Sequence, residues 1–135
     1  MFGWIKNQIF QKNVMAEIKA QSKDQELVNS LCLTPQAFEI LSSERKRLQP
    51  KHLKWNLEAF IACFTLYAWS LKRDDLPLTT KKAVAKLLYK MDKRAQTNFH
   101  FYNANHETFL GAQHYYHAFV VEHNLDYSEF EEPQE

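Results

Sequence analysis

Two histidines near the C-terminus, His114 and His117, have the residue type and spacing closest to those of a metal site. A separation of three residues puts two side chains on one side of a helix, with Cβ atoms about 5–6 Å apart. Such an imidazole pair could supply two ligands to zinc, but a closed site needs about four and a catalytic site about three. Glu107 lies about two turns away along the same helix and cannot complete the set. We therefore expect both rings to flank the core and expect no cofactor, with a metal site as the alternative.

Glycine is scarce, and this scarcity excludes several kinds of catalytic site. The chain of 135 residues contains only Gly3 and Gly111. Phosphate-binding loops such as G-x-G-x-x-G need several glycines because their backbone approaches the phosphate closely. The nucleophile elbow G-x-S-x-G is absent as well. Since no local motif positions a nucleophile or an acid–base pair, we expect that the protein is not an enzyme.

Basic residues form two groups that nucleic acid could contact. One group surrounds Pro50 and the other recurs every four residues along a predicted helix: Arg45, Lys46, Arg47, Lys51 and Lys54, then Lys82, Lys86 and Lys90. Such groups bind the phosphate backbone largely without regard to base sequence. Two helices predicted within 24–48 have the layout of a helix-turn-helix, but the second begins with side chains that are poor at contacting bases. Binding of nucleic acid is therefore an alternative function, beside a merely solvated lysine surface.

Charge is divided unevenly along the chain although the formal net charge is only +1. All seventeen Lys and Arg lie at or before Arg94, with nine acidic residues, which gives this part a net charge of +8. The residues from 95 onward carry seven acidic residues, five of the six histidines and no Lys or Arg. Such a division indicates a charged partner or a pairing between the two parts. Residues 126–135 are predicted to form a flexible acidic tail, in which Tyr127 and Phe130 are candidate partner contacts.

Apolar residues lie on more than one side of the helix predicted over residues 2–21. The two sets are Phe2, Ile5 and Ile9, and Phe10, Val14 and Ile18. At 100° per residue these sets face different directions, so the helix would contact a partner as well as its own core. Phe2 and Trp4 are therefore candidate partner contacts. Contact with a membrane surface is disfavoured because the apolar residues are spread too widely around the helix.

Hydrophobic periodicity and start signals predict helices along the rest of the chain. A short helix is predicted at about 24–31, and Thr34 followed by Pro35 marks the start of another over 35–48. The segment at about 53–72 is apolar nearly all round, which is typical of a helix buried at the centre of a bundle. A helix over 81–94 is expected to be capped by Thr79 or Thr80. After an interruption at 98–103, Asn105 is expected to cap a last helix that reaches about residue 124. One face of that helix is predicted to carry Phe109, Ala112, Tyr116, Phe119 and Val120.

The cysteines and the apolar segments indicate a cytoplasmic protein. Cys32 and Cys63 lie in apolar segments and form no C-x-x-C motif, so we expect them to pack as small apolar side chains. The N-terminus lacks the continuous apolar stretch of a secretory signal. The longest apolar segment is interrupted by Asn56 and Glu58, whereas a membrane-spanning helix needs about 20 mostly apolar residues. We therefore expect no transmembrane segment.

These observations predict a compact all-α bundle of five to six helices around a central hydrophobic helix. Residues 1–125 would form a single domain that precedes the acidic tail. We expect a non-enzymatic protein-interaction module, meaning a small accessory, adaptor or inhibitor/immunity-type protein, whose partner is a specific protein or a second copy of the chain. The candidate contacts are Phe2, Trp4, Arg45, Lys46, Arg47, Lys51, Lys82, Lys86, Lys90, Tyr127 and Phe130.

Overall fold

A computed structural model describes residues 2–131, and this span is almost entirely helical. It contains seven α-helices and two short 3₁₀ helices, and no β-strand occurs within it. Helix accounts for 82% of the described residues. The predicted all-α class is confirmed. The seven α-helices of this span exceed the five to six that were expected. The helix predicted at about 53–72 is present as α4, Trp55–Ser70; its place at the centre of a bundle stays a prediction.

The helices belong to two compact units. The described residues up to Leu66 form the N-terminal unit, and those from Tyr67 onward form the C-terminal unit. Most of α4 belongs to the first unit and its last residues to the second. The single domain predicted over residues 1–125 stays a prediction.

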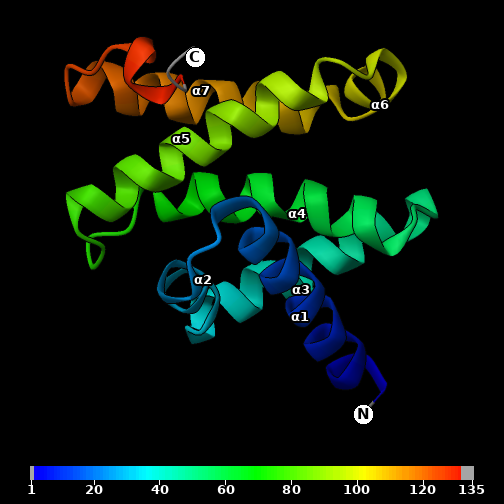
Figure 1. Ribbon diagram of the computed structural model, residues 1–135. Coiled ribbons are helices and arrows are strands. Elements are labelled where there is room, and N and C mark those ends of the chain that lie inside the picture. The colour runs from blue at the N-terminus through cyan, green and yellow to red at the C-terminus, as the bar shows by residue number, and fades with distance from the viewer. Residues whose placement is uncertain (1, 132–135) are drawn as a thin grey trace. The chain divides into compact units, whose positions relative to one another are not determined.

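The N-terminal unit begins with three helices joined by tight turns. They are α1 (Phe2–Ser22), α2 (Gln25–Cys32) and α3 (Pro35–Leu48), followed by the 3₁₀ helix η1 (Gln49–Lys51) and the first part of α4. The start of α3 is the predicted one, because the Thr34 side chain accepts a hydrogen bond from the backbone N–H of Ala37 at 3.1 Å. The helices α1 and α3 lie side by side (Figure 1).

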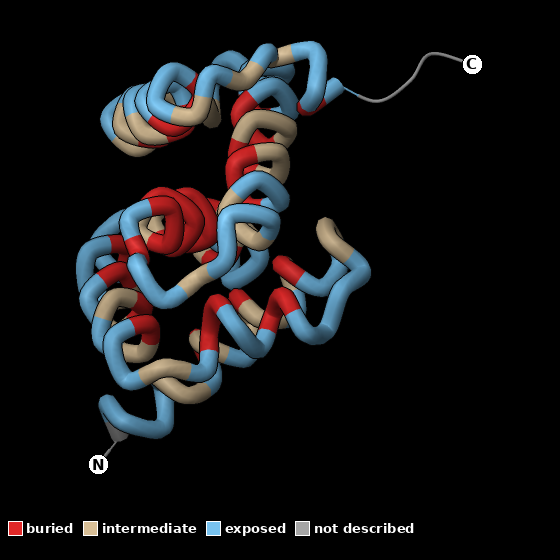
Figure 2. The backbone as a smooth tube through the Cα atoms, turned by 90° about the vertical axis from the view of Figure 1, so that its left-hand side faces the viewer, coloured by how far each residue is buried: buried red, intermediate tan, exposed pale blue. Residues whose placement is uncertain are grey.

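The core of the N-terminal unit takes up only one of the two apolar sets on α1. Phe10, Val14 and Ile18 are at most 5% exposed and form a single stripe with a spacing of four residues. In contrast, Ile5 and Ile9 of the other set remain 45% and 54% exposed. Figure 2 shows how buried and exposed positions alternate along the helices. The fold therefore leaves large apolar side chains of α1 outside the core.

The C-terminal unit contains α5 (Leu78–Ala95) and α7 (His106–Glu122), which pack together, and the short helix α6 (Phe99–Ala104) between them. The five residues predicted to share one face of the last helix are all buried: Phe109, Ala112, Tyr116, Phe119 and Val120. This part of the sequence analysis is confirmed, because a stripe of apolar residues on α7 is covered within its own unit.

Three local predictions for the C-terminal unit are wrong. The helix α5 begins at Leu78, with Pro77 at its N-cap and no side-chain cap, so neither Thr79 nor Thr80 caps it. The expected interruption at 98–103 is the helix α6, because the Asn98 side chain accepts a hydrogen bond from the backbone N–H of Phe101. Asn105 occupies the N-cap of α7, but its side-chain amide donates to the carbonyl of Phe101 instead of capping α7.

The segment predicted as a flexible acidic tail begins with a folded element. Tyr127–Phe130 forms the 3₁₀ helix η2. Asp126 and Glu129 form a capping box at its start. The Asp126 side chain accepts a hydrogen bond from the backbone N–H of Ser128, and the Glu129 side chain accepts one from the backbone N–H of Asp126. Phe130 is only 3% exposed and packs on the ring of Tyr89 of α5. Residues 132–135 of the predicted tail lie outside the described residues.

Both cysteines are free thiols in the core of the N-terminal unit. Burial raises the pKa of Cys32 to about 12 and raises that of Cys63 well above its usual range. The thiols therefore pack as small apolar groups, as the sequence predicts. None of the helices between residues 2 and 131 combines the length and the apolar character that crossing a bilayer requires.

Candidate functional site

A cleft of about 330 Å³ opens on the surface of the N-terminal unit. It is lined by four residues of α1, by residues at the end of α3 and in η1, and by the first turn of α4. These residues are Lys6, Ile9, Phe10, Asn13, Arg45, Gln49, Trp55 and Glu58. Small-molecule sites begin at about 300 Å³, so the cleft can take a few side chains of a partner.

Helix geometry explains why these residues line one cleft. On α1 the lining positions 6, 9, 10 and 13 follow the spacing i, i+3, i+4 and i+7, which defines one side of a helix. On α4, Trp55 and Glu58 are three residues apart and share a side in the same way. Packing of α1 against α3 brings Arg45 to the α1 wall.

The cleft combines apolar surface with positive charge. Ile9 and Trp55 are 54% and 64% exposed, while Phe10 is buried. Apolar side chains of this size and exposure gain most when a partner covers them. Lys6 and Arg45 supply two positive charges, against the single carboxylate of Glu58.

Arg45 is held in place by α1. Its Nε donates a hydrogen bond to Oδ1 of Asn7 at 2.5 Å. In the part of the chain that the structure describes, neither Arg45 nor Lys6 forms an ion pair. Partial burial raises the pKa of Glu58, and the Arg45 charge opposes that shift. The guanidinium group is therefore fixed at one atom, while its two Nη groups can still donate to an anion.

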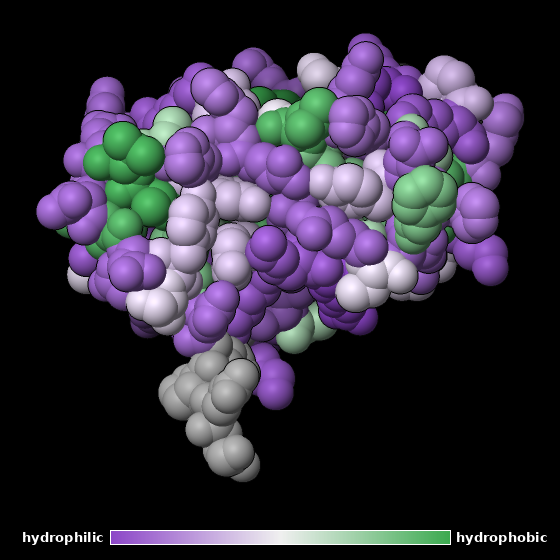
Figure 3. Space-filling model, turned by 90° about the horizontal axis from the view of Figure 1, so that it is seen from above, coloured by the Kyte–Doolittle hydropathy of each residue, from purple (hydrophilic) through white to green (hydrophobic). Residues whose placement is uncertain are grey.

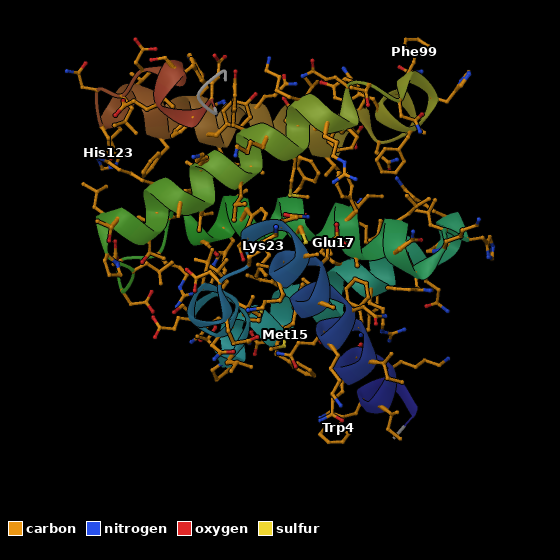
Figure 4. All side chains as sticks on the ribbon, in the orientation of Figure 1. Trp4, Met15, Glu17, Lys23, Phe99 and His123 are labelled. Carbon is orange, nitrogen blue, oxygen red and sulfur yellow. The ribbon has the colours of Figure 1, made fainter. Side chains whose placement is uncertain are left out.

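The aromatic residues predicted at the N-terminus lie on the same helix as the cleft. Trp4 is 58% exposed, and Figure 4 shows it near the N-terminal end of α1, pointing away from α2 and α3. Phe2 is the first residue of α1, and its side chain lies outside the described residues. Trp4 is therefore accessible to a partner, and its role as a partner contact stays a prediction.

The predicted basic contacts around Pro50 have different surroundings. Arg45 lines the cleft, and Lys46 and Lys51 are exposed. Arg47, however, forms a bidentate ion pair with Glu44, with both bonds at 2.8 Å. Glu44 is buried and also accepts a hydrogen bond from the Thr65 hydroxyl. Arg47 thus balances a buried carboxylate of its own unit, a role that its place in a basic cluster did not reveal.

The second predicted basic group belongs to the C-terminal unit. Lys82 and Lys86 of α5 line a smaller hollow of about 200 Å³, together with Ala83, Leu125, Glu129 and Phe130. Lys90 lies one turn further along α5 and is half-buried. Glu129 of the acidic segment therefore lines one hollow with two lysines of the stripe, within one unit. In the view of Figure 3, hydrophobic residues form separate patches in a largely hydrophilic surface.

Tyr127 joins the predicted histidine pair to an aromatic cluster in the C-terminal unit. The Tyr127 ring stacks on Tyr89 and on His117, and its hydroxyl lies 2.6 Å from His117 Nδ1. His114 is exposed and contacts the Tyr115 ring edge to face. Within residues 2–131 there is no group of three or more His, Cys, Asp or Glu side chains that could hold a metal ion. His117 is therefore engaged with an aromatic partner.

Sequence analysis missed a buried polar network in the C-terminal unit. Asp92 of α5 is fully buried and accepts hydrogen bonds from the Tyr116 hydroxyl at 2.9 Å and from the Gln96 and Gln113 amides at 3.0–3.3 Å. The Gln113 amide also donates to the Tyr102 hydroxyl. Burial, followed by the bond to Asp92, raises the pKa of Tyr116. The partners come from three helices, so no sequence motif records this network.

Seven of the eight lining residues of the cleft, all but Arg45, were also not predicted as partner contacts. The spacing of Lys6 and Ile9 places them on one side of α1, but spacing alone does not say which neighbour that side meets. Trp55 was assigned to a helix buried all round. Its exposure arises because it is the first residue of α4.

Comparison with protein-family models, with curated proteins and with solved structures finds no match to this chain.

Proposed function

We propose that the protein is a cytoplasmic, non-enzymatic interaction module that binds a segment of a protein partner in the cleft of the N-terminal unit. The observation that carries this proposal is that exposed Trp55 and Ile9 lie in one cleft with the cations Lys6 and Arg45. Large apolar side chains bordered by positive charge are typical of binding surfaces, where tryptophan and arginine contribute most of the binding energy.

The size of the effect supports a specific interaction. Complete burial of a fully exposed isoleucine gains about 1.5–3 kcal/mol. Ile9 is 54% exposed and can gain about half of that, while Trp55 is larger and 64% exposed. Loss of about 1.4 kcal/mol weakens binding tenfold. Trp4 is exposed near the N-terminal end of the same helix and could enlarge the contact. A surface of this kind suits an accessory, adaptor or inhibitor-type protein.

The proposal is tested by comparing the partners of three forms of the full chain in native lysate. Trp55→Ala removes the exposed ring of the cleft, and Val121→Ala is the matched control because Val121 is 66% exposed and belongs to the C-terminal unit. We expect a stoichiometric partner that the wild type and Val121→Ala capture and that Trp55→Ala loses. The amount captured is measured by quantitative mass spectrometry.

Two outcomes contradict the proposal. One is that no protein is captured in stoichiometric amount; the other is that Trp55→Ala captures the same partner as the wild type. If the captured partner is a second copy of the chain, sedimentation of the wild type will show a concentration-dependent mass that Trp55→Ala does not.

A further inference from the structure

The cleft of the N-terminal unit has a charge and a shape that restrict which partner it can accept, and this inference rests on the proposed function. We infer that the cleft selects a protein segment that presents a carboxylate next to a large apolar side chain. The carboxylate would contact Arg45 and Lys6, and the apolar side chain would cover Ile9 and Trp55.

The first argument is the charge of the lining residues. Lys6 and Arg45 outnumber the single carboxylate of Glu58, so the cleft carries net positive charge. Charge of one sign around a cleft attracts partners of the opposite sign and disfavours those of the same sign.

The second argument is the way in which Arg45 is held. Its Nε atom bonds to Asn7, which restrains the guanidinium group at one atom before a partner arrives. A planar guanidinium binds a carboxylate through two parallel hydrogen bonds, and less side-chain entropy is lost when the group is already fixed. Lys6 is one turn from Ile9 on the same side of α1, so it can reach the same carboxylate.

The third argument is that the apolar and charged parts are adjacent. Ile9 shares its side of α1 with Lys6, and Trp55 shares its side of α4 with Glu58. A partner that offered only carboxylates would leave Ile9 and Trp55 in water, and one that offered only apolar groups would leave two cations unpaired. Both features must therefore be present within a short segment.

A display library of random short peptides, selected against the full chain, tests this inference. We expect the enriched peptides to carry Asp or Glu close to an aromatic or branched aliphatic residue. Selection is repeated on Arg45→Gln and on Lys6→Gln, for which Lys46→Gln and Lys12→Gln are controls, because both control residues are exposed and neither lines the cleft. The acidic preference should be weaker in each of the first two variants, which keep only one of the two cations, and unchanged in the controls.

Binding of the best peptide, made synthetically, gives the magnitude. A hydrogen bond to a charged group contributes enough for its loss to weaken binding about 10-fold or more. We expect that weakening for Arg45→Gln and for a peptide in which Gln replaces Glu. When both changes are combined, the loss should be smaller than the sum of the two separate losses, because both remove the same contact. Thermal unfolding of each variant establishes that it is folded. If Arg45→Gln does not fold, Lys6→Gln tests the positive charge of the cleft in its place.

Each possible failure has a distinct meaning. Enriched peptides that are apolar without an acidic residue overturn the carboxylate preference and leave the proposed function standing. The same applies if the acidic preference is unchanged in both Arg45→Gln and Lys6→Gln. Failure to enrich any peptide overturns the inference and the proposed function together.

Discussion

At the scale of single residues, the clearest feature is that each buried carboxylate has partners suited to its position. Glu44 is buried beside Arg47, a cation of its own helix turn. Asp92 is buried more deeply and is bound by uncharged donors from Tyr116, Gln96 and Gln113. Such a network is stable only when all its members are satisfied. The loss of stability on removing one member therefore depends on which buried polar groups are left without a hydrogen-bond partner.

Replacing Asp92 by Ala should strongly destabilise the protein. The variant leaves the Tyr116 hydroxyl and the Gln113 amide without their shared acceptor, and each unsatisfied buried group costs about 1–3 kcal/mol. Urea unfolding measures the change in the free energy of unfolding. Tyr116→Phe is the control, because it removes one donor only and should cost about 1 kcal/mol. Equal stability of Asp92→Ala and the wild type would show that the network contributes nothing.

At the scale of elements, helix starts depend on side-chain caps in some places and not in others. The Thr34 side chain caps α3, whereas α5 starts at Leu78 without a cap although Thr79 and Thr80 follow directly. Thr34→Ala should therefore lower the free energy of unfolding by about 0.5–2 kcal/mol. Thr79→Ala should have no such cost, since alanine favours helix and no cap is lost. Thermal or urea unfolding of both variants measures this; equal destabilisation contradicts the assigned caps.

The 3₁₀ helix η2 is attached to its unit mainly by aromatic contacts. Phe130 packs on Tyr89, and Tyr127 stacks between Tyr89 and His117. Phe130→Ala should release this segment, because loss of a buried phenylalanine side chain costs about 3–5 kcal/mol. Hydrogen exchange of residues 125–131 should then become much faster while α5 and α7 stay protected. Val121→Ala, at an exposed position, should leave the exchange of this segment unchanged.

At the scale of the whole molecule, stability should fall in alkaline solution. Burial is the largest cause that raises the pKa of Tyr89, Tyr116 and Tyr127. An unfolded tyrosine ionises near pH 10. Because the folded chain holds these protons more tightly, their stabilisation is complete below about pH 10 and is lost as the pH rises above it. The free energy of unfolding should therefore decrease as the pH rises above about 10.

Urea titrations across this pH range test the prediction. Tyr116→Phe should make the decrease shallower, because it removes the tyrosine that Asp92 contacts. Tyr115→Phe is the matched control, since the Tyr115 hydroxyl is bound by Lys72 at the surface. A decrease that is as steep in Tyr116→Phe as in the wild type contradicts the assignment.

Most of the helices followed from the sequence, because helix formation depends on neighbours only a few residues apart. The start of α3 at Thr34 and Pro35, and the buried face of α7, are cases of this kind. The errors lie where local signals compete. Asn98 begins a short helix where an interruption was expected, and Pro77 rather than Thr79 or Thr80 occupies the N-cap of α5.

The sequence by itself determined the all-α class, the absence of glycine-rich catalytic loops and the presence of two apolar sets on different sides of α1. Only the tertiary structure decided that Ile9 and Trp55 line one cleft with Arg45, and that Asp92 is bound by Tyr116, which lies 24 residues away. The physical reason is that periodicity specifies which side of a helix is apolar, whereas packing between helices specifies what that side meets. Residues distant in sequence become one site only through that packing.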